Sequence, residues 1–310
     1  MNEPSHDALK SLREIGTLRD PILIAGFSGW GDNAGSAVAT VDYLIEQWDA
    51  EPIAEINPEV FFDFTVQRPR VRLEDGERVL DWPSVKFFHA KPEGSDRDFI
   101  LLAGPEPSLR WQTFSDAIGD MMQRAGITTS ITLGAQPAAV PHTRPLPVTL
   151  SASDNDFEQQ FGLEVRATSR YQGPVGIVSV LNVHHRERGW RNAHLRAMAP
   201  HYLTMGPNPN VAITLVKTLD YGFGTRTPLA ALEDRLHAFK DQVREAMDES
   251  PDASSYVRQL EEQYDEDRPQ TPAIEEGIDE QRTAPGGELP EAGDLLSDLE
   301  SFLKEKRDDE

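Results

Sequence analysis

A short segment that follows the first apolar run has the residue types of a catalytic turn. The apolar residues 21–26 lead into Gly26-Phe27-Ser28-Gly29-Trp30, which matches a serine nucleophile elbow except at its last position. Such an elbow needs small residues beside the serine, because the serine sits on a strained and closely packed turn. Trp30 does not meet that requirement. Ser28 is therefore a candidate nucleophile, but the sequence favours a structural turn over serine-hydrolase chemistry.

The same turn is a candidate site for the phosphates of a nucleotide. Its glycines at positions 29, 31 and 35 give a loosened dinucleotide-binding spacing, in which Gly29, Gly31 and Asn33 would lie against the ligand. The spacing is one residue longer than the usual fingerprint, and Asp32 would bring a negative charge to the pyrophosphate. Asp32 is better explained as an acid that caps the following helix, whose dipole favours it without any ligand.

A proline-rich loop at residues 137–147 carries the other candidate groups. His142 and Arg144 lie two positions apart between prolines, after an apolar strand predicted at residues 127–134. Arg144 could hold an anionic group, and His142 could act as a general acid or base. The alternative is a rigid subunit contact in which Arg144 pairs with a carboxylate. For a loop of this composition we favour the contact.

An enzyme would require the glycine-rich turn and the proline-rich loop to meet at one rim of the sheet. In open α/β sheets, ligands bind at the carboxyl ends of the strands, so both segments are in a position to line a ligand site. In such a site Asp32 or His142 would act as the acid or base. The catalytic candidates are Ser28, Asp32 and His142, and the ligand-binding candidates are Gly29, Gly31, Asn33 and Arg144.

Adjacent histidines at positions 184 and 185 form a third polar cluster. Neighbouring side chains on an extended chain point in different directions, so a metal would need ligands from elsewhere. We interpret residues 182–189 as a solvated loop. The other histidines are isolated in the sequence, which predicts neither a metal nor a cofactor.

Apolar patterning predicts an α/β fold in which a mostly parallel, mixed sheet positions these segments between helices. The turn and the helix after the first strand would be followed by a strand at residues 52–56 that closes a βαβ unit. Predicted strands are residues 21–26, 52–56, 99–104, 127–134, 176–181 and 202–205, with short antiparallel pieces at 60–64, 71–74, 78–82 and 85–89 around an Asp75-Gly76 turn. Predicted helices are a short turn near Leu9, residues 38–48, residues 107–123 with Ser108 as N-cap, residues 192–198 and residues 211–219.

The C-terminal part is predicted to be a helical hairpin followed by an acidic tail. Thr227-Pro228 would open the first helix, with threonine as the N-cap. Its apolar stripe from Leu229 to Met247 has the spacing of coiled-coil packing, and residues 256–264 would fold back as the second helix. Beyond about Asp265 the composition predicts disorder, apart from a short apolar helix near residues 295–303 that could dock. The predicted divisions are a lead-in at 1–19, an α/β core domain at 20–226, the hairpin at 227–265 and the tail at 266–310.

The charge of the chain excludes several classes of partner. The 310 residues carry a formal net charge of −23, and residues 248–310 account for −15 of it, with 21 acidic and 6 basic residues. Nucleic acids and anionic membranes need a basic surface, so neither is an expected partner. No run of 18 apolar residues could cross a bilayer, and the N-terminus lacks the pattern of a secretory signal. The chain has no cysteine, which fits the reducing cytoplasm.

Three motifs occur together as they do in one known family. They are Ile24-Ala25-Gly26-Phe27-Ser28-Gly29-Trp30-Gly31-Asp32, then Leu133-Gly134-Ala135-Gln136 with Pro141-His142-Thr143-Arg144-Pro145, then Gly173-Pro174-Val175-Gly176-Ile177. Over about residues 15–265 the chain resembles the proteasome assembly chaperone family, second-subunit type, in its bacterial, actinobacterial branch. The resemblance implies a phosphorylase/hydrolase-like three-layer fold, often assembled as a homotrimer or another ring, and no established enzymatic activity. Members that dock on proteasome rings often end in a hydrophobic–tyrosine–any-residue motif, whereas this chain ends in Lys306-Arg307-Asp308-Asp309-Glu310.

Two functions are therefore weighed. The first is a non-enzymatic, oligomeric scaffold or assembly-chaperone-like protein that associates with itself as a trimer, with another protein as a further partner. The alternative is a hydrolase or phosphorylase-like enzyme, or a binder of small anions or nucleotides, with its site at the carboxyl ends of the strands. The two differ in whether the glycine-rich turn and the proline-rich loop converge on one pocket.

Overall fold

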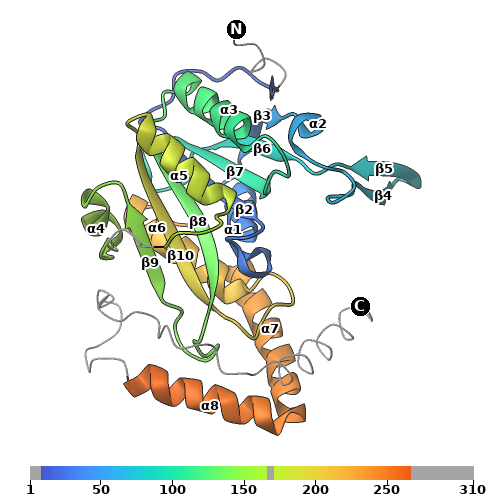
Figure 1. Ribbon diagram of the computed structural model, residues 1–310, viewed down its shortest axis with the longest axis vertical. Coiled ribbons are helices and arrows are strands. Elements are labelled where there is room, and N and C mark those ends of the chain that lie inside the picture. The colour runs from blue at the N-terminus through green and yellow to red at the C-terminus, as the bar shows by residue number, and fades with distance from the viewer. Residues whose placement is uncertain (1–7, 166–170, 267–310) are drawn as a thin grey trace.

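An eight-stranded mixed sheet forms the centre of the molecule (Figure 1). The computed structural model describes residues 8–165 and 171–266, so the predicted tail and its apolar stretch lie outside the described residues. The strand order is β1-β3-β6-β7-β2-β8-β10-β9. The four strands in the middle, β7, β2, β8 and β10, run parallel to one another, and antiparallel strands flank them on both sides. The strands are β1 (Leu9–Ser11), β2 (Ile22–Ser28), β3 (Glu51–Ile56), β6 (Val85–Ala90), β7 (Phe99–Pro105), β8 (Thr129–Ala138), β9 (Val148–Ala152) and β10 (Arg191–Pro200).

Helices cover both faces of the sheet, which confirms the predicted three-layer α/β fold (Figure 1). Side chains alternate between two cores along β2: Ile22 and Ile24 enter one, and Leu23 and Phe27 enter the other. This is the period-two alternation of a strand that is buried on both faces. The first core is closed by α1 (Ser36–Gln47), α4 (Asp156–Phe161), α6 (Pro209–Phe223) and α7 (Ala230–Glu249), and the second by α2 (Pro58–Phe61), α3 (Trp111–Arg124) and α5 (Ile177–Glu187).

A two-stranded arm projects from this body (Figure 1). Strands β4 (Arg70–Glu74) and β5 (Glu77–Asp81) pair with each other and form a separate sheet. Asp75 and Gly76 connect them with φ angles of 52° and 85°. Two positive φ values in a two-residue loop are typical of a type I′ turn, whose twist suits a hairpin. The hairpin predicted around this turn is confirmed.

The largest error of the sequence prediction concerns residues 176–198. The apolar stretch at 176–181 begins a helix, α5, which includes most of the predicted loop at 182–189, and the predicted helix at 192–198 is the strand β10. Short apolar runs do not distinguish a strand from a buried helix. The buried residues Ile177, Leu181 and His185 recur every four positions, which is helical spacing. β10 lies between β8 and β9, so its position in the sheet outweighs the helix propensity of its alanines and Met198.

The strand β3 closes the predicted βαβ unit with β2 and α1. β3 is antiparallel to β6, and β6 is antiparallel to β7, so β3 runs parallel to β2 in the same sheet, with β6 and β7 between them. The helical turn predicted near the N-terminus does not form. The residues around Leu9 form β1, because they pair with the edge of β3 instead of closing a helical turn.

The short strand predicted at residues 60–64 does not form, and two helices begin at other residues than predicted. Residues 58–61 are the helix α2, because the Asn57 side chain accepts a hydrogen bond from the Glu59 amide and Pro58 occupies the first helical position. α3 begins at Trp111, after Arg110 in a left-handed conformation, so Ser108 is not its N-cap. α7 begins at Ala230, because the Thr227 side chain instead hydrogen-bonds to other parts of the chain.

The last described helix, α8 (Pro251–Glu266), lies across the end of α7 (Figure 1). A separate apolar cluster joins the two helices to residues 202–203, which are not the predicted strand. Val257 and Leu260 of α8 and Val243 of α7 are buried in this cluster with Tyr202. Among the described residues, no helix combines the length and apolar character that a bilayer crossing requires.

Candidate functional site

The glycine-rich turn lies at the carboxyl ends of β2 and β8. β2 ends at Ser28, and the turn then crosses to β8, where the Ala135 amide donates to the carbonyl of Gly31 at 3.2 Å. Asp32 also forms a bridge with Ala135. Because β2 and β8 are parallel, this rim is also the one from which the proline-rich loop departs. The predicted common rim is therefore present.

Both carboxylate oxygens of Asp32 are engaged by the start of α1. Oδ1 accepts from the Ala37 amide at 2.6 Å, and Oδ2 accepts from the Val38 amide at 3.0 Å. These amides have no partner within the helix, so the carboxylate completes the helix N-terminus. Burial raises the pKa of Asp32 to about 6, against the opposing effect of the amide donors. The side chain is therefore placed as a cap of α1.

Ser28 and the glycines beside it pack against Glu106. The Glu106 amide donates to the Ser28 carbonyl at 2.9 Å, and Glu106 Oε2 accepts from the Ile177 amide at 2.9 Å. Gly29 has a φ of 136°, and a Cβ there would lie 3.0 Å from the Glu106 side chain. Close approach and backbone conformation therefore explain Gly29 without a ligand. Within the described part of the chain, no histidine or carboxylate is hydrogen-bonded to the Ser28 side chain.

Asn33, in the same turn, has one side-chain donor without a hydrogen-bond partner among the described residues. Its side-chain Nδ2 is buried and has no partner among residues 8–165 and 171–266. A buried donor without a partner is uncommon and unfavourable. One unpartnered donor atom does not by itself define a ligand-binding site.

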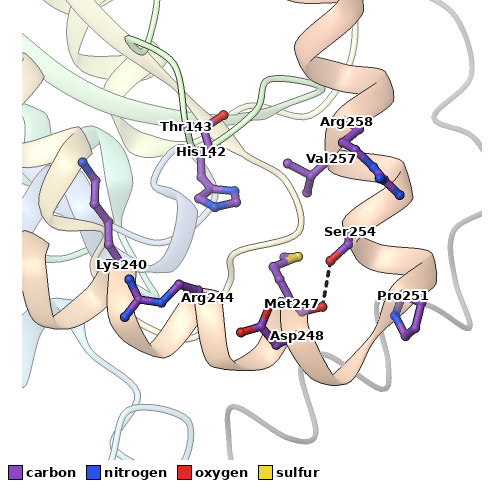
Figure 2. Close-up of a pocket in the computed structure, with 10 residues that line it drawn as sticks. All are labelled: His142, Thr143, Lys240, Arg244, Met247, Asp248, Pro251, Ser254, Val257 and Arg258. Carbon is purple, nitrogen blue, oxygen red and sulfur yellow. Dashed lines mark hydrogen bonds between the residues drawn. The ribbon is translucent and has the colours of Figure 1, made fainter.

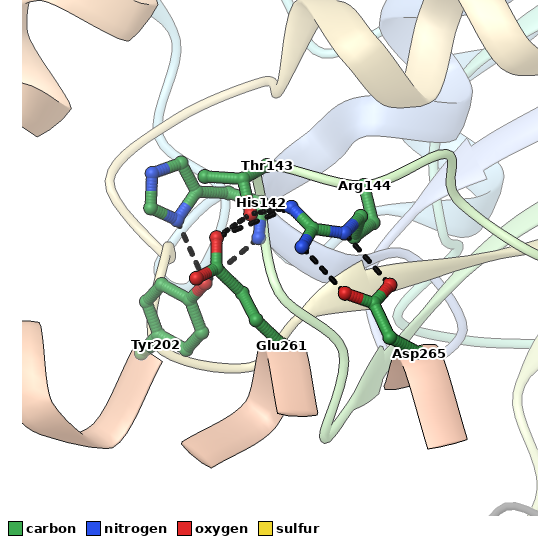
Figure 3. Close-up of polar contacts among 6 residues, drawn as sticks. All are labelled: His142, Thr143, Arg144, Tyr202, Glu261 and Asp265. Carbon is green, nitrogen blue, oxygen red and sulfur yellow. Dashed lines mark hydrogen bonds and ion pairs between the residues drawn. The ribbon is translucent and has the colours of Figure 1, made fainter. Parts of the chain in front are cut away.

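His142, in the proline-rich loop, is held by Tyr202. The hydroxyl of Tyr202 lies 2.8 Å from His142 Nδ1 and also accepts from the His142 amide at 2.8 Å (Figure 3). Burial lowers the pKa of His142, so the imidazole is neutral near pH 7. The aromatic cluster of the C-terminal helices thus fixes this histidine in place.

Arg144 is bound by the carboxylates of α8 (Figure 3). Its Nε and Nη2 form a bidentate pair with Asp265 at 2.9 and 2.6 Å, and its Nη1 lies 3.3 Å from Glu261. Thr143 also donates to Glu261, and Tyr264 donates to the carbonyl of Pro145 at 2.8 Å. The planar guanidinium matches the two oxygens of a carboxylate. The expected pairing of Arg144 with a carboxylate thus occurs within the chain, and an anionic ligand would have to displace it.

The two loops share a rim, but the two large pockets lined by the proline-rich loop do not include the candidate side chains of the turn. His142 lines two pockets, of about 730 and 850 Å³, and neither includes Ser28, Asp32 or Asn33. The first lies between α7, α8 and the loop (Figure 2). The second lies between the loop, α4 and α6. The candidates for an enzyme site therefore separate into a turn that caps α1 and a loop that contacts α8.

A buried polar network beneath α5 was missed by the sequence analysis. Ser130 of β8 lies 2.8 Å from His185 Nδ1, and Thr132 lies 3.0 Å from His194 Nδ1. Burial lowers the pKa of both His185 and His194 to about 3, so both are neutral. The interpretation of His185 as a solvated loop residue is wrong, because α5 turns it onto the sheet. Polar residues at alternate positions of two strands were the available signal.

Comparison with models of known protein families shows which family the chain belongs to. The model of the PAC2 family matches residues 23–247, which is most of the chain and includes the turn, the loop and α7. The chain belongs to the PAC2 family. This confirms the family resemblance inferred from the motifs in the two loops and before α5.

Solved structures similar to this PAC2 chain come from actinobacteria and archaea. A PAC2 family protein of Streptomyces avermitilis is 32% identical, with a TM-score of 0.69, and the match covers 77% of this chain and 100% of that one. A proteasome-assembly chaperone homologue of Mycobacterium tuberculosis is 35% identical, with a TM-score of 0.67, over 76% of this chain and 99% of that one. An archaeal proteasome activator of Pyrococcus furiosus, 18% identical with a TM-score of 0.61 over 77% of this chain and 98% of that one, shares the fold. A search of curated proteins gives no match.

The PAC2 model ends at Met247, before the start of α8. The carboxylates that bind Arg144 therefore lie outside the residues matched to the family, whereas Arg144 itself lies inside them. The groove between α7 and α8 likewise combines matched and unmatched residues. α8 therefore lies outside the residues that the PAC2 model matches.

Proposed function

We propose that this PAC2 protein is a non-enzymatic, self-associating scaffold of the assembly-factor type, which forms a homotrimer in the cytoplasm and presents a surface to a further protein. The observation that carries the proposal is the exposed apolar face of the β4–β5 arm. Similarity to a proteasome-assembly chaperone homologue supports an assembly factor. A chain without cysteine suits the reducing cytoplasm.

The arm has one largely apolar face, on which Arg78 lies opposite Leu73, and one charged face. Val71 pairs with Leu80, and Leu73 lies two residues along, so these three side chains share a face. They are 57%, 50% and 72% exposed, respectively. On the other face Arg72 pairs with Asp81 at 2.9 Å and with Glu74 at 3.0 Å. An amphipathic arm whose apolar side faces solvent is typical of an interaction surface.

The isolation of the arm also favours a partner. A hairpin of two strands is only marginally stable in water by itself. In the described residues β4 and β5 pair only with each other, so their outer edges keep free backbone donors and acceptors. A second copy of the chain could cover the apolar face and pair with an edge. The same contact repeated around an axis gives a closed assembly, and the family resemblance favours three copies.

The placement of the enzyme candidates also supports a scaffold. Asp32 uses both oxygens to cap α1, and Arg144 uses its guanidinium to bind α8. His142 is half-buried beside Tyr202. Asp32, His142 and Arg144 are therefore each engaged in contacts within the fold.

We expect the double substitution Val71→Asp and Leu73→Asp to convert the oligomer into a monomer. Two carboxylates on this face would have to be buried in the interface, and Arg78 lies opposite only one of them, so the expected cost is several kcal/mol per interface. Light scattering coupled to size-exclusion chromatography measures the mass of each variant. Both residues are more than half exposed in the single chain, so the variant should keep its circular dichroism spectrum and melting behaviour.

Glu77→Lys, on the charged face of the same arm, is the matched control. It changes the charge of the arm without placing a charge among the apolar side chains, so the oligomer should persist. An unchanged mass for the double aspartate variant would show that the arm is not the interface.

A further inference from the structure

A groove lies between α7, α8 and the proline-rich loop (Figure 2). Its volume is about 730 Å³, within the range of pockets that hold ligands. Met247 of α7 and Val257 and Pro251 of α8 supply an apolar floor. His142 closes one end from the loop. A floor of this kind suits apolar side chains from a peptide segment.

Cations surround that floor. Lys240 and Arg244 of α7 and Arg258 of α8 line the groove, against a single carboxylate, Asp248. Arg244 is paired with Asp241, 2.7 Å away. Lys240 and Arg258 form no ion pair within residues 8–165 and 171–266. Because the chain as a whole is strongly acidic, a groove with a positive rim is a local exception.

The chain itself contains a segment of complementary character. Residues 291–303 carry four acidic residues and no lysine or arginine. Their large apolar residues recur at helical spacing and are Leu295, Leu296, Leu299, Phe302 and Leu303. The segment lies in the part of the chain that follows α8. Apolar and acidic side chains together match an apolar floor with a cationic rim.

We propose that residues 291–303 bind in the groove between α7 and α8 of their own chain. About 25 residues connect Glu266 to this segment, a length that can reach roughly 30 Å. A covalent connection of that length gives an effective concentration in the millimolar range, so a weak contact suffices to fill the groove. The bound segment would cover Met247 and Val257 and pair its carboxylates with Lys240 and Arg258.

Occupation of the groove by the chain's own segment would regulate access to it. A partner with an acidic, amphipathic segment would have to compete with residues 291–303. The proposal concerns α7 and α8 and is independent of the arm formed by β4 and β5. It can therefore hold whether or not the chain forms a trimer.

Distance measurement between two spin labels on the full chain tests the proposal. The chain has no cysteine, so Gln259→Cys on α8 and Ser297→Cys in the segment give one label at each place. Gln259 is exposed, and Ser297 lies opposite the apolar residues on a helical projection. Binding should give a narrow distance distribution. A free connection of this length should give a broad one, centred at roughly 35 Å.

Charge reversal identifies the place of binding. Lys240→Glu with Arg258→Glu should broaden the distribution, because the rim would repel the carboxylates of the segment. Arg124→Glu with Arg226→Glu is the matched control, since both residues are exposed outside the groove and the change in net charge is the same. The narrow distribution should survive in this control.

Three results would overturn the proposal. A broad distribution in the labelled chain without charge reversal would show that the segment does not bind. A narrow distribution that survives the groove reversal would place it elsewhere. A narrow distribution that disappears when labelled chain is diluted with excess unlabelled chain would show binding to a second copy.

Discussion

Lowering the pH from 7 to 5 is expected to destabilise the folded protein by about 4 kcal/mol through His185 and His194. Burial lowers the pKa of each to about 3 in the folded state, against 6.5 for an exposed histidine. As the pH falls through 6.5, the unfolded chain binds protons that the folded chain does not. The stability that these residues contribute is complete above pH 6.5 and is lost as the pH falls toward 3. Each histidine contributes about 2 kcal/mol of this loss by pH 5.

Urea unfolding at pH 7 and pH 5 measures this effect. In the double variant His185→Gln and His194→Gln, the part of the stability loss between pH 7 and pH 5 that comes from these two histidines should disappear. Asp32 acts in the opposite direction, because its pKa is raised to about 6 and its ionisation disfavours folding between pH 4 and 6. Both proteins contain Asp32, so subtracting the stability change of the variant from that of the unsubstituted chain cancels the contribution of Asp32. Equal pH dependence in both proteins would show that the histidines are not buried as neutral groups.

The second large expected effect is a loss of about 3 kcal/mol of stability at pH 7 when Asp32 is replaced by alanine. The substitution removes both acceptors of the Ala37 and Val38 amides and leaves these donors without partners. Removal of the buried charge, whose pKa is raised by burial, offsets part of the loss of these hydrogen bonds at pH 7. Chemical denaturation of the full chain measures the change. A catalytic carboxylate held in a solvated cleft would give little change in stability, and that result would contradict the capping role.

Two variants serve as controls for Asp32. Asp32→Asn keeps one acceptor oxygen of similar shape, so about half of the loss is expected. Ser28→Ala removes a hydroxyl for which the described residues provide no histidine or carboxylate partner, and should leave the stability within about 0.5 kcal/mol. A Ser28→Ala loss as large as that of Asp32→Ala would show that the turn depends on contacts other than the cap.

The parts of the fold that local chemistry determines were predictable from the sequence. Asp75-Gly76 predicted a hairpin because few other residue pairs tolerate two positive φ values. The wholly apolar run before Ser28 predicted a buried central strand, and the first core contains its alternate residues. Asp32 was assigned to the helix start on the strength of the helix dipole. Each of these signals spans only a few residues.

The errors occur where distant contacts decide the outcome. Residues 176–181 are apolar enough for a strand or a buried helix, and the four-residue spacing of Ile177, Leu181 and His185 that indicates the helix extends beyond that run. The pairing of Arg144 with Asp265 joins residues 121 positions apart, so no local spacing could predict it. Thr227 has the residue type of an N-cap, but its side chain bonds to Trp48 and Asp220 instead. The enzyme candidates share a rim as expected, but contacts with α1 and α8 keep them apart.

The mass of the full chain in solution at micromolar concentration tests most directly whether this PAC2 protein is a self-associating scaffold. Light scattering determines that mass without reference to molecular shape. One chain has a mass of 34.6 kDa, so we expect about 104 kDa for the proposed trimer. A mass of 34.6 kDa across the micromolar range would contradict self-association, and with it the proposed role.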